Sequence, residues 1–374
     1  MRNTMIYPFS DKSLPLLLYF SEFQPEYEIA ALVSPPGLGL AGHSPLHAAN
    51  RNGSSSLIVQ NNVEAALPQC DALVVPFGDH KNDPVFCDAL DVVRRAAEMG
   101  KEIFCCLKLT NSELKEIKQI CQASGACWHD GLREPLNVFK TISYGNQKIS
   151  APVVLVHDLG IEADSFEITL SMARRFLRDG YKVSVIGPKP EYNILGFHGS
   201  ALLIDALYGN EKLKNISRFI KALQLYVHMV EVRETPDVIV FHCPGAAVPM
   251  PGLFQTDSGV YTYLISRAIR PDFSLMCMAY STPTVEAIQT IHEELERQFG
   301  FGIDALHLSN RALHVETSKF FGKEQHVYLP EQTAFERACG LRAEERGDIP
   351  VFNALCRKEQ DLLYAHVVRT LESY

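Results

Sequence analysis

The sequence predicts an α/β protein with two Rossmann-like parallel-sheet domains, the second a degenerate P-loop-like domain with a helical C-terminal tail. Strand-like apolar runs alternate with helix-like segments through two long stretches of the chain. The 374 residues exceed what one ordinary hydrophobic core accommodates. Residues 152–187 follow the strand, glycine loop, helix and strand order of a phosphate-binding loop, but the loop and helix lack the lysine of such a site.

The first domain is expected at residues 1–130 and is followed by a linker at 131–150, which shows no strong periodicity. Short loops join its alternating elements, which indicates a parallel sheet covered on both faces. The expected strands are 5–7, 28–33, 57–59, 72–75, 103–107 and 126–128, and the expected helices are 11–23, 63–67, 84–99 and 111–122.

The second domain is expected at residues 151–330, with a tail of two helices at 331–374, the last starting at Val351. Asp164 and Glu167 match an Asp-x-x-Glu capping box, and Gly180 suits the end of the same helix. The expected strands are 153–156, 181–186, 238–241, 273–279, 305–308 and 326–329, and the expected helices are 164–179, 199–208, 211–232, 257–268 and 284–299.

The loop after the first strand of this domain carries acidic side chains where a phosphate site needs amides and an ammonium group. It holds Asp158, Glu162, Asp164 and Glu167, and no lysine lies between Lys148 and Lys182. Carboxylates beside a helix N-terminus repel a triphosphate, so we expect the nucleotide chemistry to be lost. The first three carboxylates also suit Mg²⁺, but for Asp164 a helix cap is the simpler interpretation. Asp158, Gly160, Glu162 and Ser165 are the candidate ligand-binding residues here.

A glycine-rich loop in the first domain matches the dinucleotide fingerprint Gly-x-Gly-x-x-Gly at residues 37–42. The context fails, because the loop follows the second strand and Pro45 interrupts the helix that should come next. His43 and His47 have a metal-ligand spacing only if that segment is helical. We therefore expect a flexible loop over a ligand crevice. Its candidate binding residues are Ser34, Gly37, Gly39, Gly42 and His43.

A Pro- and Gly-rich segment follows the strand at 238–241. Cys243 beside His242 suggests an activated thiolate, but adjacent strand residues point to opposite faces. A loop lining a cleft is the preferred interpretation, with Cys243 and Gly245 as candidate ligand-binding residues. The predicted binding surface is a crevice between the domains, walled by residues 34–43, 158–165 and 243–252. Ser309-Asn310 follows a strand, at the place where P-loop relatives contact the nucleotide base. Two polar residues of this kind are common at strand ends.

Composition narrows the class of function. Hydrophobic residues make up 47% and charged residues 21%, as in soluble globular proteins. The net charge of −9 disfavours nucleic acid as a partner. No apolar run reaches the length of a membrane span, and the N-terminus lacks a secretory signal, so a cytoplasmic protein is expected. The ten cysteines include no Cys-x-x-Cys pair, which indicates reduced thiols and no predicted metal site.

Several segments resemble a bacterial family of peptide-maturation-system proteins, whose genes accompany small ribosomal precursor peptides and radical-SAM enzymes. The matching segments are Tyr7-Pro-Phe-Ser10, residues 31–42, Cys106-Leu-Lys-Leu109, Leu159-Gly160, residues 165–170, residues 180–187 and residues 236–251. The similarity covers most of residues 4–330. More distantly, the chain resembles P-loop proteins of the dethiobiotin and cobyrinic acid synthetase type, in which a lysine often stands where this chain has Ser165.

The resemblance implies an accessory protein of ribosomal-peptide natural-product maturation that binds a precursor peptide or a radical-SAM partner. The missing phosphate chemistry of the loop implies that it has no NTPase activity. Two alternatives stay open. One is a nucleotide-dependent ligase or isomerase acting on an amino-acid-like substrate, and the other is a scaffold or homodimerisation protein. No catalytic residue of the family transfers to this sequence, and no cofactor is identified.

Overall fold

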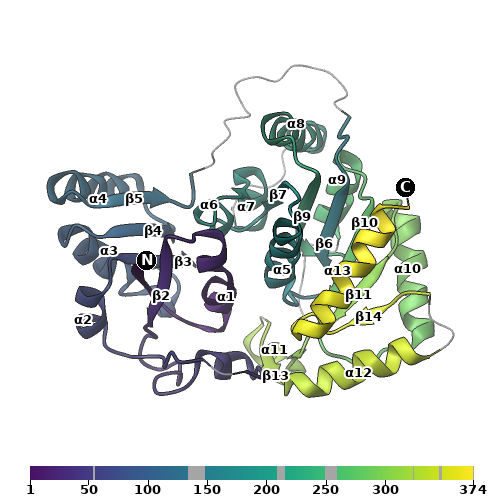
Figure 1. Cartoon of the computed structure of the whole chain (residues 1–374), viewed down its shortest axis with the longest axis horizontal. Coiled ribbons are helices and arrows are strands. Elements are labelled where there is room, and N and C mark those ends of the chain that lie inside the picture. The colour runs from purple at the N-terminus through teal and green to yellow at the C-terminus, as the bar shows by residue number, and fades with distance from the viewer. Residues whose placement is uncertain are drawn as a thin grey trace. The chain divides into compact units, whose positions relative to one another are not determined.

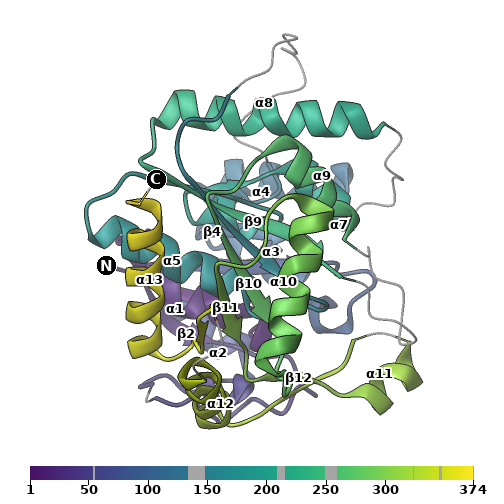
Figure 2. The same ribbon diagram turned by 90° about the vertical axis from the view of Figure 1, so that its right-hand side faces the viewer.

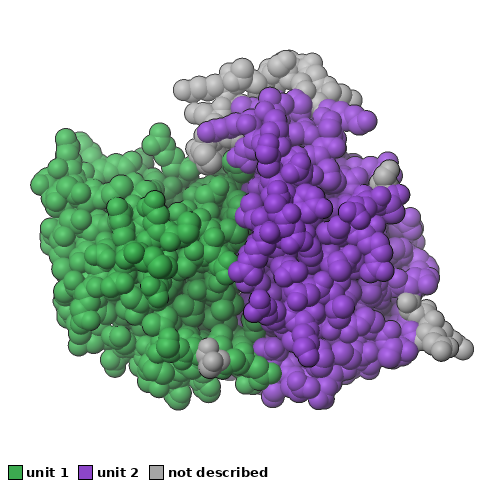
Figure 3. All heavy atoms as spheres, viewed as in Figure 1, with its two compact units in different colours: residues 1–135, 189–201 green, residues 136–188, 202–374 purple. Residues whose placement is uncertain are grey.

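The structure is a computed structural model of the chain (Figure 1), and it describes residues 1–53, 55–133, 148–208, 215–248, 259–322, 324–344 and 348–373. The chain forms two compact units, coloured separately in Figure 3. Unit 1 comprises Met1–Pro135 and Lys189–Ala201, and unit 2 comprises Leu136–Pro188 and Leu202–Tyr374. Each unit contains a parallel sheet with helices on its faces, which confirms the predicted α/β class.

The sheet of unit 1 has five parallel strands in the order β2-β1-β3-β4-β5. These are β1 (Arg2–Ile6), β2 (Tyr27–Leu32), β3 (Ala72–Gly78), β4 (Glu102–Leu107) and β5 (Cys127–Asp130). The inner strands β3 and β4 are almost entirely buried, as expected for a sheet that is covered on both faces.

Helices cover both faces of this sheet. Alternate residues of β4 point to opposite sides, so Ile103 and Cys105 pack among α3 and α4 residues, while Phe104 packs edge-on against Phe20 of α1 at 5.3 Å. The α-helices are α1 (Leu14–Phe23), α2 (Val63–Ala66), α3 (Ala89–Glu98), α4 (Asn111–Ser124) and α6 (Glu191–Ile194). Short 3-10 turns lie at Asp11–Ser13, Pro45–Ala49, Leu67–Gln69 and Pro84–Phe86.

The segment at 189–201 joins unit 1 although it comes late in the sequence. Glu191 Oε1 accepts a hydrogen bond from the N–H of Phe77 at 2.8 Å, at the carboxyl end of β3. The Asn193 amide donates to the carbonyl of Gly131 at 2.7 Å. These bonds tie α6 to the ends of the sheet strands.

The main sheet of unit 2 has the order β14-β11-β10-β6-β9-β7, with β6 between β10 and β9. These strands are β6 (Val153–Asp158), β7 (Val183–Gly187), β9 (Val238–Ala246), β10 (Phe273–Met278), β11 (Ala305–Leu308) and β14 (Val351–Phe352). The two-residue strand β8 (His198–Gly199) lies in the 189–201 segment of unit 1. A separate antiparallel pair is formed by β12 (Arg311–Leu313) and β13 (His326–Tyr328).

Two layers of helices cover this sheet. On one face α5 packs against α13, with the rings of Phe176 and Tyr364 at 5.0 Å, and Figure 2 shows α10 on the other side of the sheet. The core of that other face joins sheet residues to α8 and α9 and, further along, to α10 and α12. The helices are α5 (Ser165–Arg178), α7 (Ala201–Tyr208), α8 (Ile216–Glu234), α9 (Val260–Ala268), α10 (Val285–Phe299), α11 (Val315–Phe321), α12 (Glu331–Ala343) and α13 (Arg357–Leu371).

Some predicted elements differ from the structure. Residues 57–59 form no strand, and nearby only a single bridge joins Val33 to Gln60. Val351–Phe352 is a strand beside β11 rather than the start of the last helix, which begins at Arg357. Residues 134–147 of the predicted linker lie outside the described residues. None of the described helices is long and apolar enough to cross a membrane.

Candidate functional site

A cluster of polar side chains lies at the carboxyl ends of the central strands of unit 2. In open α/β sheets this edge is where ligands bind. The cluster comes from the β6–α5 loop, from β9 and from the end of β11, which the parallel register brings to one edge. Its members are Asp158, Asp164, Ser165, His242, His307, Ser309 and Arg311, and we call them the carboxyl-edge cluster.

Asp158 ends β6 and turns its carboxyl group back into the following loop. Its Oδ1 accepts the N–H of Ala163 at 2.8 Å, and its Oδ2 accepts the hydroxyl of Ser165 at 2.6 Å. In a phosphate-binding loop such donors face the phosphate. Here a carboxyl group of the protein itself takes these two donors.

Burial raises the pKa of the Asp158 carboxyl to about 8, and the nearby Glu162 and Asp164 carboxylates add to the increase. The hydrogen bonds from Ser165 and Ala163 oppose it. Near neutral pH the group therefore holds a proton that it would lose in water, which makes it a candidate acid in this cluster.

Ser165 connects Asp158 to a histidine from another strand. Its Oγ lies 2.9 Å from Nε2 of His242, and all three side chains are buried. Because the single Ser165 hydroxyl hydrogen is donated to Asp158, Nε2 of His242 is the donor to Ser165 Oγ and does not take the serine proton in this arrangement. The order differs from a serine-protease triad, because here the serine stands between the carboxyl group and the imidazole.

Asp164 makes a second set of contacts, with the end of β11. Its Oδ2 accepts a hydrogen bond from the Ser309 hydroxyl and lies 3.4 Å from Nε2 of His307. Nδ1 of His307 accepts the N–H of Ala354 at 3.1 Å, so Nε2 carries the ring proton and donates it to Asp164. Burial would raise the pKa of Asp164, but the hydrogen bonds of His307 and Ser309 and the charge of Arg311 lower it to about 2.

The predicted capping box at Asp164 is wrong. Asp164 does occupy the N-cap position of α5, but its backbone is left-handed with φ of 66°, and its side chain makes no capping hydrogen bond. The side chain is turned to His307 and Ser309 instead. A left-handed non-glycine residue is held in place by its surroundings, and such residues gather at functional sites.

Arg311 brings a positive charge to the cluster. Its guanidinium donates to the Tyr328 hydroxyl at 2.8 Å and lies over that ring, and Nη1 lies 3.4 Å from the carbonyl of Glu162. Its backbone N–H donates to Ser309 Oγ at 2.9 Å. The arginine thus links the β12–β13 pair to the β6–α5 loop.

The structure brings together only some of the predicted site residues. In unit 2, Asp158 and Ser165 are in contact, Gly160 is buried in the same loop, and the Glu162 side chain is exposed. Cys243 lies on β9 with Gly245, and its Sγ lies 3.7 Å from the Thr262 hydroxyl within the hydrophobic core, away from the cluster. The strand persists through His242 and Cys243, so the two side chains point to opposite faces, and the suggested thiolate–imidazole pair does not form.

The remaining predicted residues belong to unit 1. Ser34 is buried after β2, and Gly37, Gly39 and Gly42 are exposed with φ of 96°, 68° and 85°. The ring of His43 stacks on that of His47 at 4.6 Å. A 3-10 turn at Pro45–Ala49 follows instead of a long helix, and the loop follows edge strand β2. In this strand order the switch point of the sheet lies between β1 and β3, so the glycine loop does not match a dinucleotide site.

Sequence reasoning singled out the cluster members of the β6–α5 loop and noted His242 beside Cys243 and Ser309 at a strand end, but it gave His307 and Arg311 no role. His307, Ser309 and Arg311 come from the end of β11 and the start of β12, and His242 comes from β9. His307, Ser309 and Arg311 share one signal, a polar residue at or just after the carboxyl end of a buried strand, whereas His242 lies in the middle of β9. Of the predicted crevice walls, 34–43 belongs to unit 1 and 158–165 to unit 2, and 249–252 lies outside the described residues.

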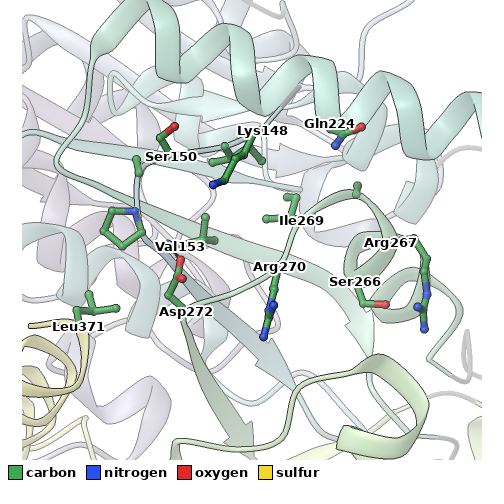
Figure 4. Close-up of a pocket in the computed structure, with 14 residues that line it drawn as sticks. Lys148, Ser150, Val153, Gln224, Ser266, Arg267, Ile269, Arg270, Asp272 and Leu371 are labelled. Atoms are coloured by element: carbon green, nitrogen blue, oxygen red, sulfur yellow. Dashed lines mark hydrogen bonds between the residues drawn. The ribbon is translucent and has the colours of Figure 1, made fainter. Parts of the chain in front are cut away.

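A hollow of about 700 Å³ lies at the opposite end of the same sheet (Figure 4). Lys148, Arg270 and Asp272 line it, at the amino ends of β6 and β10, and Asp272 Oδ2 accepts the N–H of Val153 at 2.8 Å. None of the predicted site residues lines it. Because ligands of open α/β sheets bind at the carboxyl ends, the carboxyl-edge cluster is the better candidate.

No family model matches the sequence, and no curated protein is similar to it in sequence. Among solved structures, the fold is similar to the crystal structure of a DUF1611 family protein from Anabaena variabilis ATCC 29413. The TM-score is 0.65 with 16% sequence identity, over 99% of this chain and 100% of that chain. Chloroplast FtsY from Physcomitrella patens matches over 61% of this chain and 68% of its own, with 16% identity and a TM-score of 0.25, too low to support a comparison. At such identities the likeness concerns the fold alone.

Proposed function

We propose that the chain is a cytoplasmic accessory protein of ribosomal-peptide natural-product maturation. In this proposal it binds a precursor peptide or a radical-SAM partner enzyme at the carboxyl edge of unit 2 and does not hydrolyse nucleoside triphosphates. One observation supports the lack of nucleotide hydrolysis: the Asp158 carboxyl group accepts hydrogen bonds from the Ala163 N–H and the Ser165 hydroxyl of the loop.

Three properties of the loop oppose polyphosphate binding. Two donors of the loop are taken by Asp158, the helix α5 begins behind the left-handed Asp164, and Glu162 adds a carboxylate on the exposed side. No lysine lies between Lys148 and Lys182 to offset these charges. A triphosphate would have to displace a buried carboxyl group and bind beside carboxylates, without the cation that P-loops use.

The peptide part of the proposal rests on the sequence resemblance. Polar strand ends that include Arg311, Tyr328 and the exposed Glu162 offer charged and aromatic contacts of the kind that recognise peptide termini and side chains. The observed contacts and the resemblance favour binding over turnover, because the cluster's hydrogen bonds are largely made within the protein.

A nucleotide titration tests the loss of nucleotide chemistry. ATP and GTP, each with Mg²⁺, are added to millimolar concentration and the thermal unfolding is followed, with sodium sulfate at equal ionic strength as the control. We expect no stabilisation beyond the control. A nucleotide at 100 times its dissociation constant would add about 2.7 kcal/mol. A saturable increase of that size would overturn this part of the proposal.

Peptide binding is tested by fluorescence anisotropy with a labelled precursor peptide from the chain's own gene neighbourhood. Glu162→Lys reverses a charge on the loop, and Glu293→Lys makes the same change on the exposed face of α10 as the matched control. We expect the first substitution alone to change the affinity. Equal affinities of both variants and the wild type would remove the carboxyl edge from the proposal.

A second candidate is an enzyme acting on an amino-acid-like substrate, such as an isomerase or a ligase. It is favoured by the raised pKa of Asp158, which makes this carboxyl group a candidate acid, with Ser165 and His242 hydrogen-bonded beside it. In that case Ser165→Ala would abolish turnover of an amino-acid derivative and leave peptide binding intact. If the wild type binds the peptide but does not turn over the amino-acid derivative, the result supports the accessory-protein proposal.

A further inference from the structure

Three side chains of unit 1 gather at the amino ends of β4 and β5, far in the sequence from the carboxyl-edge cluster. They are Glu102, Cys127 and His129, and each offers one ligand atom within 4.8 Å of the others. Among the described residues, this is the group in which at least three ligand atoms of His, Cys, Asp or Glu lie within 4.8 Å of one another. The carboxyl-edge cluster uses none of them.

Strand geometry explains how the three meet. Cys127 and His129 are two residues apart on β5, so their side chains point to the same face, while Trp128 packs against the core on the other face. Glu102 is the partner of Cys127 in the parallel β4–β5 register. Since β5 is the edge strand of the sheet, this face is accessible at Cys127, which is exposed.

Two of the three ligand–ligand distances can be compared with a tetrahedral transition-metal site, and the third is within 4.8 Å. His129 Nε2 lies 3.5 Å from Cys127 Sγ and 2.7 Å from Glu102 Oε1. With zinc bonds of about 2.3 Å to sulfur and about 2.05 Å to nitrogen and oxygen, tetrahedral ligands stand about 3.6 Å (S to N) and about 3.3 Å (N to O) apart. The sulfur and nitrogen are thus already placed, and the carboxylate oxygen would withdraw by about 0.6 Å.

Hydrogen bonding alone leaves this arrangement incompletely explained. A single imidazole nitrogen has either one hydrogen or one lone pair, so Nε2 of His129 cannot make separate two-centre hydrogen bonds to Glu102 and Cys127. A cation between the three atoms could be bound by a lone pair from each of them. The ligand types suit zinc, since thiolate and imidazole select such ions over Mg²⁺ or Ca²⁺.

Neighbouring groups hold the ligands as an outer shell does in metal sites. Oε2 of Glu102 accepts a hydrogen bond from Arg2, whose guanidinium also lies 3.4 Å from the Tyr27 hydroxyl. Oε1 lies 2.7 Å from Nε2 of His129, and the Tyr27 hydroxyl also hydrogen-bonds to this carboxylate. The His129 ring stacks on Phe104, with centroids 4.3 Å apart and planes 8° apart, which fixes the direction of Nε2.

We propose that Glu102, Cys127 and His129 bind one zinc-type divalent cation, with water completing a tetrahedral shell. The thiolate and carboxylate charges balance the ion, and binding releases the thiol proton and any proton on Nε2. The site lies at the amino edge of unit 1 and adds a metal-binding function to this chain that does not depend on the proposed peptide binding.

Metal titrations of the full chain test the proposal. Zinc affinity is measured by competition with a chromophoric chelator, and cobalt is used as a probe because a Cys–Co²⁺ bond gives a charge-transfer band. Cys127→Ser and His129→Ala are compared with two matched controls. Cys87→Ser removes the other exposed thiol, and His80→Ala removes a histidine that is paired with Glu113 but has no cysteine beside it.

We expect one zinc ion per chain in the wild type and in both controls, with the cobalt–thiolate band present. Losing a direct ligand in Cys127→Ser or His129→Ala should weaken zinc binding by more than the about 10–100-fold typical of outer-shell changes, and the band should vanish in Cys127→Ser. Circular dichroism checks that each variant is folded. Wild-type affinity in these two variants, or no stoichiometric ion in the wild type, would overturn the proposal.

Discussion

Nε2 of His307 and Oδ2 of Asp164 lie 3.4 Å apart, although 143 positions separate the two residues in the chain. The N–H of Ala354 fixes which imidazole nitrogen carries the proton, and so fixes the direction of this contact. The contact joins the loop after β6 to the end of β11, two strands away in the sheet. The left-handed backbone of Asp164 turns the carboxylate toward His307.

Asp164→Asn should destabilise the protein in a pH-dependent manner. Asparagine tolerates left-handed φ, so the change removes the charge and spares the backbone. The folded-state pKa of about 2, compared with the ordinary aspartate value of 3.8, corresponds to about 2 kcal/mol. This contribution is present above pH about 4 and is lost as the pH falls toward 2. Urea unfolding of wild type and variant at pH 7 and pH 3 measures it.

The difference between the two proteins should therefore shrink from pH 7 to pH 3. Asp91→Asn is the control, because Asp91 pairs with Arg94 on the surface and is 69% exposed. Its effect should stay small at both pH values. A difference for Asp164→Asn that does not change between pH 7 and pH 3 would contradict the role assigned to the His307 and Arg311 contacts.

Asp158→Asn should show the opposite dependence. Because burial raises the folded-state pKa of Asp158 to about 8, its stabilising effect is complete below pH about 4 and is lost as the pH rises through 8. The neutral amide keeps an acceptor for the Ala163 N–H, and its NH2 group stands where Oδ2 accepts the Ser165 hydroxyl, so Ser165 has to accept this hydrogen bond instead of donating it. We expect the variant to gain stability relative to the wild type between pH 4 and pH 9, measured by denaturant unfolding across this range. Parallel stability curves would refute the raised pKa.

Ser165→Ala should cost about 1–3 kcal/mol, since it leaves buried Asp158 and His242 without a shared partner. Thr290→Ala is the control, because Thr290 also donates a hydroxyl hydrogen bond but on the exposed surface of α10, to the Glu286 carbonyl. Its loss should change the unfolding free energy by less than about 0.5 kcal/mol. Equal costs for the two substitutions would mean that the buried contacts of Ser165 add nothing.

Arg342→Ala should destabilise the C-terminal elements of unit 2. The guanidinium makes two bonds to the Glu359 carboxylate, at 2.7 and 2.8 Å, and a third to the carbonyl of Val351. Glu359 is only 2% exposed, so its charge would be left buried, at a cost near the lower end of about 3–5 kcal/mol because Arg342 itself is partly exposed. Thermal and denaturant unfolding measure the loss.

The surface pair of Arg297 and Glu294 provides the comparison, with side chains 76% and 47% exposed. Arg297→Ala should cost about 0–1 kcal/mol. Arg342→Lys should recover only part of the stability, because an ammonium group cannot make the two parallel bonds. Full recovery by lysine would show that charge alone matters at this position.

The alternation of strands and helices was predictable because each buried strand is a nearly continuous apolar run. The opposite directions of His242 and Cys243 also follow from strand geometry alone. The contacts of Asp164 do not, since they depend on a left-handed backbone and on strand register at residues more than 140 positions away. A sequence match to Asp-x-x-Glu cannot distinguish a capping side chain from one that is turned toward another strand.

Two further features escaped sequence reasoning for reasons of length and spacing. Val351–Phe352 is a two-residue strand, too short to show a period, and its apolar side chains fit a helix pattern equally well. Cys127 and His129 do not match the Cys-x-x-Cys spacing, because on a strand two ligands lie on the same face when they are two residues apart. Glu102 joins them only through the pairing of β4 with β5.

Unit 1 takes a short piece of chain from the middle of the sequence, and this has a practical consequence for dissecting the molecule. A fragment cut after residue 135 would lack Glu191 and Asn193, leaving the Phe77 amide and the Gly131 carbonyl without those partners. During synthesis the ribosome must release Leu136–Pro188 of unit 2 before unit 1 is complete. Gene truncations at the apparent domain border should therefore yield poorly folded products, and recombinant work on either half is better served by point substitutions in the intact chain.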